Sequence, residues 1–129
     1  AVGSTDELFE NIKLLILPSI WHESGSRLIF EAYSRGIPVL AFDSGGNKEM
    51  LFNKGSDIFR LPTTYLDQNG RKRLTEWNPT EMIERIIYFY NNNDYYKSYS
   101  NDLIGYFNAL DLNSNFDDAI EKFLNFANY

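Results

Sequence analysis

The chain has no cysteine and a single histidine, His22. Without cysteine it can form no disulfide framework, no thiolate nucleophile and no cysteine-built metal site. A lone histidine also removes most of the ligand sets that zinc uses. We therefore expect a fold without cross-links and without a metal, in a reducing compartment such as the cytoplasm.

Basic residues and long apolar runs are also scarce. The 18 Asp and Glu outnumber the 12 Lys and Arg, so the net charge is -6, and the one basic cluster is 71-RKR-73. Such an acidic balance disfavours a nucleic-acid partner. Apolar runs such as 14-LLILP-18 are far short of the roughly 20 residues that a membrane-spanning helix needs, so no transmembrane segment is expected.

The residues that are present favour one compact α/β domain over residues 1–129. Hydrophobic residues make up 43% of the chain, enough for a core. Apolar runs at 13–17 and 37–42 have the unbroken character of strands covered on both faces. Residues 26–35 between them have a helical stripe, with Gly36 as the C-cap. Strand, helix and strand predict a right-handed βαβ unit with parallel strands.

The rest of the chain predicts a third strand at 57–62, after a short helix at 47–54. We expect an irregular loop at 63–78, with a turn at Asn69-Gly70. The order 78-NPTE-81 is typical of a helix start, and it precedes an apolar stripe. That stripe comprises Met82, Ile83, Ile86, Ile87 and Tyr90.

Further helical patterns at 94–108 and 115–128 complete the domain. The predicted layout is a βαβ core at 1–62, the loop at 63–78 and helices at 79–129. This is a Rossmann-like parallel-sheet half-domain with a C-terminal helical tail. Three strands are few for a doubly wound fold, which suggests that the chain is part of something larger.

Two turns rich in small residues follow the first two strands, 18-PSIWHESGS-26 and 43-DSGGN-47. In an open parallel sheet, ligands bind beyond the carboxyl ends of the strands. Backbone N–H groups at helix starts attract anions there, and Gly lets a phosphate approach the backbone closely. Two adjacent turns of this kind suit a phosphorylated ligand, although neither is a known phosphate-loop motif.

Glu23 and Glu31 add carboxylates that suit hydroxyl groups, because an ionised carboxylate only accepts hydrogen bonds. If one helix spanned both residues, they would lie about 12 Å apart along its axis. Plainer interpretations remain open. Glu31 is four residues from both Arg27 and Arg35, as in an exposed ion-pair ladder. Glu23 could equally be a solvated loop residue, His22 a packed or loop histidine, and Gly45-Gly46 a simple turn.

The motif order PS-x-W-x-E-S-x-S-R-x-x-x-E-A, then G-I-P-V-L-A, then GG-N-x-E, resembles a known family. It is similar to the C-terminal domain of retaining GT-B glycosyltransferases of the GT4 type (glycosyl transferases group 1), over about Lys13 to Glu49. The chain departs from the family at Gly25, where Phe is common, and at Lys48, where Pro is frequent. These departures affect the shape of the expected sugar pocket.

The resemblance implies a donor site for a nucleoside diphosphate sugar such as a UDP- or GDP-hexose, with no other cofactor and no obligatory metal. It places the donor sugar at His22, Glu23, Ser24 and Gly25, and the ribose at Glu31. It places the diphosphate at Gly25, Ser26 and Arg27, under a closing turn formed by Gly45, Gly46 and Asn47. No catalytic residue is assigned with certainty.

The resemblance also implies a missing N-terminal domain that holds the acceptor site, and an upstream Arg and Lys pair that neutralises the leaving diphosphate. The expected activity of the parent protein is hexosyl transfer to a glycan, lipid or other acceptor in polysaccharide or glycoconjugate biosynthesis. Contact with a membrane surface would come through the absent domain. The 129 residues alone are expected to be inactive.

Two other classes stay open on the residues alone. One is a non-catalytic Rossmann-like binding or scaffold domain, for which the aromatic-rich tail would supply partner contacts. The other is a flavodoxin-like signalling domain, which the sequence favours less because no acidic cluster closes its first strand. Nucleotide binding separates the first expectation from these two.

Overall fold

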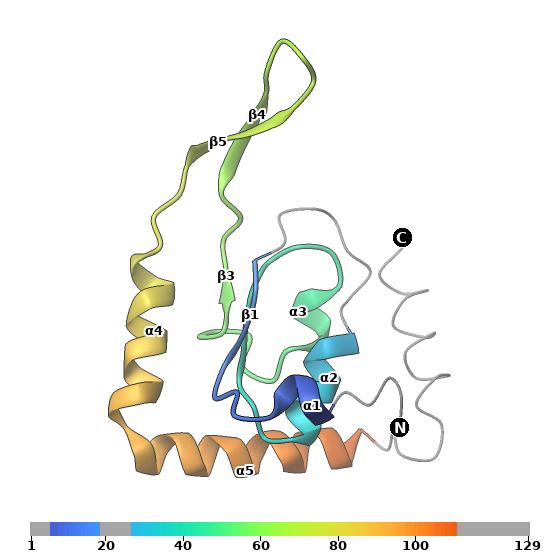
Figure 1. Ribbon diagram of the computed structural model, residues 1–129, viewed down its shortest axis with the longest axis vertical. Helices are drawn as coiled ribbons and strands as arrows, with labels where there is room; N and C mark the ends of the chain where they lie inside the picture. The colour runs from blue at the N-terminus through green and yellow to red at the C-terminus, as the bar shows by residue number, and fades with distance from the viewer. Residues whose placement is uncertain (1–5, 19–26, 111–129) are drawn as a thin grey trace.

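A computed structural model of the chain describes residues 6–18 and 27–110 and has the predicted α/β architecture (Figure 1). A three-stranded sheet forms its centre, and helices pack around it. In chain order the elements are α1 (Asp6–Phe9), β1 (Leu15–Leu17), α2 (Arg27–Ser34), β2 (Val39–Phe42), α3 (Asn47–Met50), β3 (Ile58–Phe59), β4 (Thr63–Leu66), β5 (Lys72–Glu76), α4 (Thr80–Asn91) and α5 (Asn93–Ala109).

The sheet has the order β1-β2-β3, with all strands parallel, as the sequence predicts. Leu17 pairs with Ala41, and Phe42 pairs with Phe59, so the three strands end at one edge. Every residue of β2 is buried, which confirms the expectation that this strand is covered on both faces. For β1 that expectation is wrong: Ile16 is 40% exposed, because β1 is an edge strand of this sheet.

Helix α2 begins at Arg27 and packs its apolar face inward, with Ile29, Phe30 and Tyr33 fully buried. It ends at Ser34, and Gly36 follows with a φ of 70°, in the left-handed region that favours glycine. The Gly36 carbonyl accepts a 2.6 Å hydrogen bond from the Ser100 hydroxyl of α5. A Cβ at this position would meet the Ser100 Oγ at 2.2 Å, so the contact with α5 also requires glycine.

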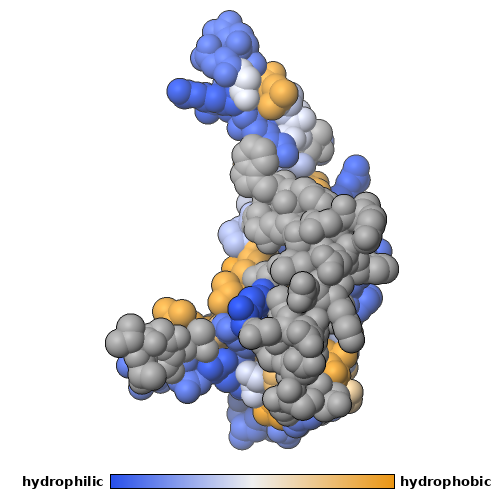
Figure 2. All heavy atoms as spheres, turned by 90° about the vertical axis from the view of Figure 1, so that its right-hand side faces the viewer, coloured by the Kyte–Doolittle hydropathy of each residue, from blue (hydrophilic) through white to orange (hydrophobic). Residues whose placement is uncertain are grey.

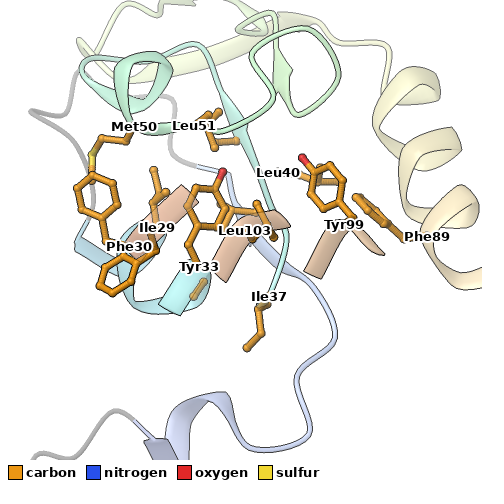
Figure 3. Packing of buried hydrophobic residues seen from close by; sticks show 14 of the residues in the cluster. Ile29, Phe30, Tyr33, Ile37, Leu40, Met50, Leu51, Phe89, Tyr99 and Leu103 are labelled. Carbon is orange, nitrogen blue, oxygen red and sulfur yellow. The ribbon is translucent and has the colours of Figure 1, made fainter. Parts of the chain in front are cut away.

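The hydrophobic core lies between the sheet and α2 on one side and α4 and α5 on the other (Figure 3). Tyr33 and Phe30 of α2 point toward α5, where Leu103 is fully buried. The Tyr33 hydroxyl accepts a 3.1 Å hydrogen bond from the Phe52 backbone N–H. Its polar end is therefore satisfied inside the core, as a buried phenol requires.

Residues 63–76 form an antiparallel hairpin, β4 with β5, instead of the predicted irregular loop. The expected turn at Asn69-Gly70 is confirmed: Gly70 has a φ of 73° and donates its N–H to the Asp67 carbonyl. Arg73 pairs with the Asp67 carboxylate at 2.9 Å. The hairpin stands clear of the body (Figure 1), and on the face that Figure 2 shows it is mostly hydrophilic with a hydrophobic patch.

Helix α4 begins where the sequence predicts, because the Asn78 side chain accepts hydrogen bonds from the Thr80 N–H and hydroxyl. Its predicted apolar stripe is only partly correct. Met82 is buried and Ile86 half-buried, but Ile83, Ile87 and Tyr90 are about half exposed, at 47%, 51% and 56%. The buried anchor of the helix is instead Phe89, which contacts aromatic rings of α5.

Helix α5 confirms the helical pattern predicted at 94–108, whereas the pattern at 115–128 lies outside the described residues. The described part also contains α1, which the sequence analysis did not anticipate. Within that part, no helix is both long and apolar enough to cross a membrane.

Buried and half-buried tyrosines predict a loss of stability in alkali. Removal from water is the main reason that the pKa values of Tyr33, Tyr96, Tyr99 and Tyr106 are raised. The unfolded chain, with tyrosine pKa values of about 10, therefore loses these protons first. The stabilising effect is complete below about pH 10 and is lost as the pH rises above it.

We expect the urea concentration at the unfolding midpoint to be lower at about pH 11 than at about pH 8. Tyr33→Phe should make this decrease smaller. Circular dichroism during urea titration at each pH measures both effects. A midpoint that does not change, or that rises with pH, would contradict this account of the core.

Candidate functional site

A polar turn of this chain lies at the carboxyl edge of the sheet. Leu17 at the end of β1 pairs with Ala41 of β2, so β1 ends beside the residues that lead into the turn after β2. That turn runs from Asp43 to Asn47, and Arg60 follows β3 at the same edge. This is the edge at which open parallel sheets bind ligands.

Several of the predicted site residues fall in residues 19–26, outside the described part of the chain. These are His22, Glu23, Ser24, Gly25 and Ser26, for which the expected contacts with donor sugar and diphosphate stay predictions. Arg27 is described: it opens α2 and is exposed. Of the predicted diphosphate ligands, Arg27 thus lies at the first position of α2, a helix of eight residues.

Glu31 lies one turn into α2 and is half-buried. The ion-pair ladder with Arg35 is not what the structure shows. The Arg35 guanidinium pairs with Asp6 and donates a 2.7 Å hydrogen bond to the Glu31 backbone carbonyl, not to its carboxylate. Over residues 6–18 and 27–110 the Glu31 carboxylate has no hydrogen-bond or ion-pair partner. It therefore keeps its accepting capacity for another molecule.

The turn after β2 is compact and mostly buried. Gly45 has a φ of 56°, and Ser44 is only 3% exposed. The Asn47 side chain is fully buried, and its amide donates a 3.3 Å hydrogen bond to the Phe42 carbonyl. Its Oδ1 has no partner among the described residues. Asn47 therefore fixes the turn against β2, and Gly45 is half-buried whereas Gly46 is buried.

A buried ion pair that could not be read from the sequence joins the start of β3 to α4 and α5. Asp57, just before β3, is fully buried and accepts a 2.8 Å hydrogen bond from the Arg85 Nε of α4, and another from the Tyr99 hydroxyl of α5. Burial raises the pKa of Asp57, and its two partners act in the opposite direction. Arg85 also lies over the Phe89 ring, 4.3 Å from its centroid.

A second missed feature is a pocket at the base of the hairpin. It encloses about 290 Å³ and is lined by residues 60–62, residues 76–78 and Glu81. Trp77 is 46% exposed there and contacts the buried Phe42 ring edge to face, with centroids 5.7 Å apart. The sequence signal that could have indicated this pocket is Trp77 followed by Asn-Pro at a helix start. It lies in a segment that we expected to be an irregular loop.

Metal ligands are not grouped in the described ranges. Over residues 6–18 and 27–110, no three His, Cys, Asp or Glu side chains lie close enough together to hold a metal ion. The expectation that the chemistry needs no metal stays a prediction, because His22 and Glu23 lie outside these ranges.

Comparison with known families supplies the identification. Residues 2–104 match the family described as Glycosyl transferases group 1. The chain belongs to the glycosyl transferases group 1 family. This match covers every described helix and strand except the end of α5. Comparisons with curated proteins and with solved structures found no match.

Membership of glycosyl transferases group 1 indicates glycosyl transfer as the activity of the parent protein. The family match extends beyond the motif block of Lys13 to Glu49, so it includes the hairpin, α4 and most of α5. The turn at residues 43–47 lies at the carboxyl edge of the sheet, the edge at which open parallel sheets bind ligands.

Proposed function

We propose that the chain is the donor-binding part of a retaining GT-B glycosyltransferase of the GT4 type. In the parent enzyme it would hold a nucleoside diphosphate sugar during transfer of the hexose to a glycan, lipid or other acceptor. The reaction would take place in the cytoplasm, in the synthesis of a polysaccharide or glycoconjugate. The observation that carries this proposal is the half-buried Glu31 carboxylate on α2 of a group 1 domain, which has no hydrogen-bond or ion-pair partner among residues 6–18 and 27–110.

The role that we assign to Glu31 is to accept hydrogen bonds from the two ribose hydroxyls of the nucleotide. A carboxylate facing the diphosphate would repel it, so Glu31 has to face the hydroxyls instead. Each charge-assisted hydrogen bond contributes about 1.5–3 kcal/mol. Half-burial strengthens such a bond, because water competes less well for the carboxylate.

The diphosphate would bind between the two turns. We propose backbone N–H groups of Gly25, Ser26 and Arg27, with the Arg27 guanidinium, as its ligands, and Glu23 with its neighbours as the contacts of the donor sugar. The Gly45-Gly46-Asn47 turn would cover the donor from the adjacent strand. Fixed backbone dipoles stabilise the charge of a leaving diphosphate without a metal ion, and Glu23 would orient the sugar.

The remaining machinery would come from parts of the parent protein outside this chain. The half-exposed Ile16 on edge strand β1 favours a neighbour on that side of the sheet. We propose that upstream βα units pack there and bring the Arg and Lys that neutralise the diphosphate, with an N-terminal domain for the acceptor. Peripheral membrane contact, if the acceptor is a lipid, would belong to that domain.

Nucleotide binding tests the proposal. Saturation-transfer NMR of this chain with UDP, GDP and ADP, and with their hexose conjugates, should reveal binding in one nucleotide series. Glu31→Ala should weaken that binding about tenfold or more, because it removes at least one charge-assisted hydrogen bond. Glu84→Ala is the matched control, since it removes the same charge from the exposed surface of α4.

Binding that Glu31→Ala leaves unchanged would contradict the assigned site. Binding of no nucleotide would favour the second candidate, a non-catalytic scaffold domain, for which the half-exposed Ile83, Ile87 and Tyr90 of α4 would be contact residues. In either case we expect the chain alone to transfer no sugar. A radiolabelled-donor assay that detected turnover would refute that expectation.

A further inference from the structure

The pocket at the base of the hairpin, which we call the Trp77 pocket, has neither Glu31 nor the Gly45-Gly46 turn in its lining. It is lined by residues 60–62, residues 76–78 and Glu81. We propose that the Trp77 pocket binds one pyranose ring of a carbohydrate, with the ring stacked on the Trp77 indole. Sugar binding itself does not depend on the donor site, but the role of the pocket as a subsite for the acceptor glycan rests on the proposed function.

The chemistry of the lining favours a sugar. A pyranose ring has an apolar C–H face, which suits an aromatic surface, and a rim of hydroxyls that both donate and accept hydrogen bonds. Trp77 is 46% exposed in this pocket. Glu76 and Glu81 can accept from hydroxyls, and Arg60 and the Asn78 amide can donate to them.

These polar groups have hydrogen-bonding capacity to spare. In the part of the chain that the structure describes, the side chains of Arg60, Glu76 and Glu81 make no hydrogen bond or ion pair. Asn78 uses its Oδ1 to cap α4 through Thr80, which leaves its amide hydrogens for another partner. Asn78 is one of the residues that line the pocket.

Size and charge disfavour a phosphorylated ligand in this pocket. About 290 Å³ lies at the small end of ligand sites, which run from roughly 300 to 1,000 Å³, so it suits one ring better than a nucleotide. Its ionisable side chains are two carboxylates and one guanidinium, and the excess negative charge repels phosphate. A neutral sugar meets neither obstacle.

The fold holds the indole firmly and near the carboxyl edge. Trp77 directly follows β5, and its ring packs against Phe42, which is 3% exposed at the end of β2. Arg60 and Leu61 also line a neighbouring depression that reaches Asp43. The Trp77 pocket is therefore adjacent to the turn that we propose closes over the donor, where a glycan chain would pass.

Indole N–H signals test this directly, because the chain has only two Trp residues. In a ¹⁵N-labelled sample, the Trp77 signal is identified as the one that Trp77→Phe removes. Maltose, cellobiose, lactose, mannobiose and chitobiose are then titrated to millimolar concentration. We expect a saturable shift of the Trp77 indole with at least one of them. Combined Glu76→Gln and Glu81→Gln should weaken this binding about tenfold.

Leu66→Ala is the matched control, because Leu66 is exposed farther out on the same hairpin and does not line the pocket. No Trp77 shift with any sugar, or a shift that the paired Gln substitutions leave unchanged, would overturn the inference. A Trp77 shift with UDP, GDP or ADP that the same substitutions abolish would also overturn it, since the ring would then stack a base.

The failure of this inference is distinguishable from failure of the proposed function. Sugar binding at Trp77 without any Glu31-dependent nucleotide binding supports the pocket and contradicts the donor site. Glu31-dependent nucleotide binding without a Trp77 shift supports the donor site and contradicts the sugar-binding pocket.

Discussion

Replacing Asp57 with alanine is expected to lower the free energy of unfolding by about 3–5 kcal/mol, because it leaves a buried charge without its partner. The Asp57 side chain is fully buried, and that of Arg85 is only 12% exposed. Asp57 joins β3 to α4 through Arg85 and to α5 through the Tyr99 hydroxyl. Urea denaturation followed by circular dichroism measures the change.

The control for this prediction is Asp102→Ala, which removes the same charge from an exposed position of α5 and should change stability by less than about 0.5 kcal/mol. Adding Arg85→Met to Asp57→Ala should recover part of the loss, because the uncompensated charge is then gone. A loss of less than about 1 kcal/mol for Asp57→Ala would show that the pair does not hold the helices to the sheet.

Replacing Phe30 with alanine is expected to cost about 3–5 kcal/mol, as for other large aromatic residues removed from a core. Phe30 is fully buried on α2 and contacts the Phe107 ring of α5, with centroids 6.5 Å apart. Figure 3 shows it within the cluster that joins these two helices. Because α2 also carries Glu31, this packing positions the proposed ribose contact.

Leu28→Ala is the matched control on the same helix, since Leu28 is 37% exposed and should lose clearly less stability than the buried Phe30. Urea midpoints of the two variants, with the slopes of the transitions, give the comparison. Equal losses at the two positions would mean that the buried face of α2 has been assigned incorrectly.

The sheet and α2 could be predicted from the sequence because their signals are local. The apolar run of β2 is buried on every residue, and Gly36 stands where α2 needs a left-handed residue. The hairpin could not be predicted in this way. Most of β5 is exposed, so its sequence has no alternation between a buried and a solvent face.

In the candidate site, too, the features with local sequence signals could be predicted and the others could not. The carboxyl edge could be predicted because the turns follow recognisable strands. Asp57 could not be, since its partners Arg85 and Tyr99 lie 28 and 42 residues farther along the chain, and no local pattern marks a charge that will be buried. The prediction that the whole apolar stripe of α4 packs inward was wrong for a similar reason. Helical periodicity marks an apolar face but does not say what covers it.

The most direct test of the central claim compares a nucleoside diphosphate with its 2′,3′-dideoxy analogue. The base comes from the nucleotide screen, and calorimetry measures both ligands on the original chain and on Glu31→Ala. If Glu31 holds the ribose hydroxyls, the original chain should bind the dideoxy analogue about tenfold or more weakly, and Glu31→Ala should bind both ligands almost equally. Equal binding of the two ligands by the original chain, or the same preference in Glu31→Ala, would contradict the claim.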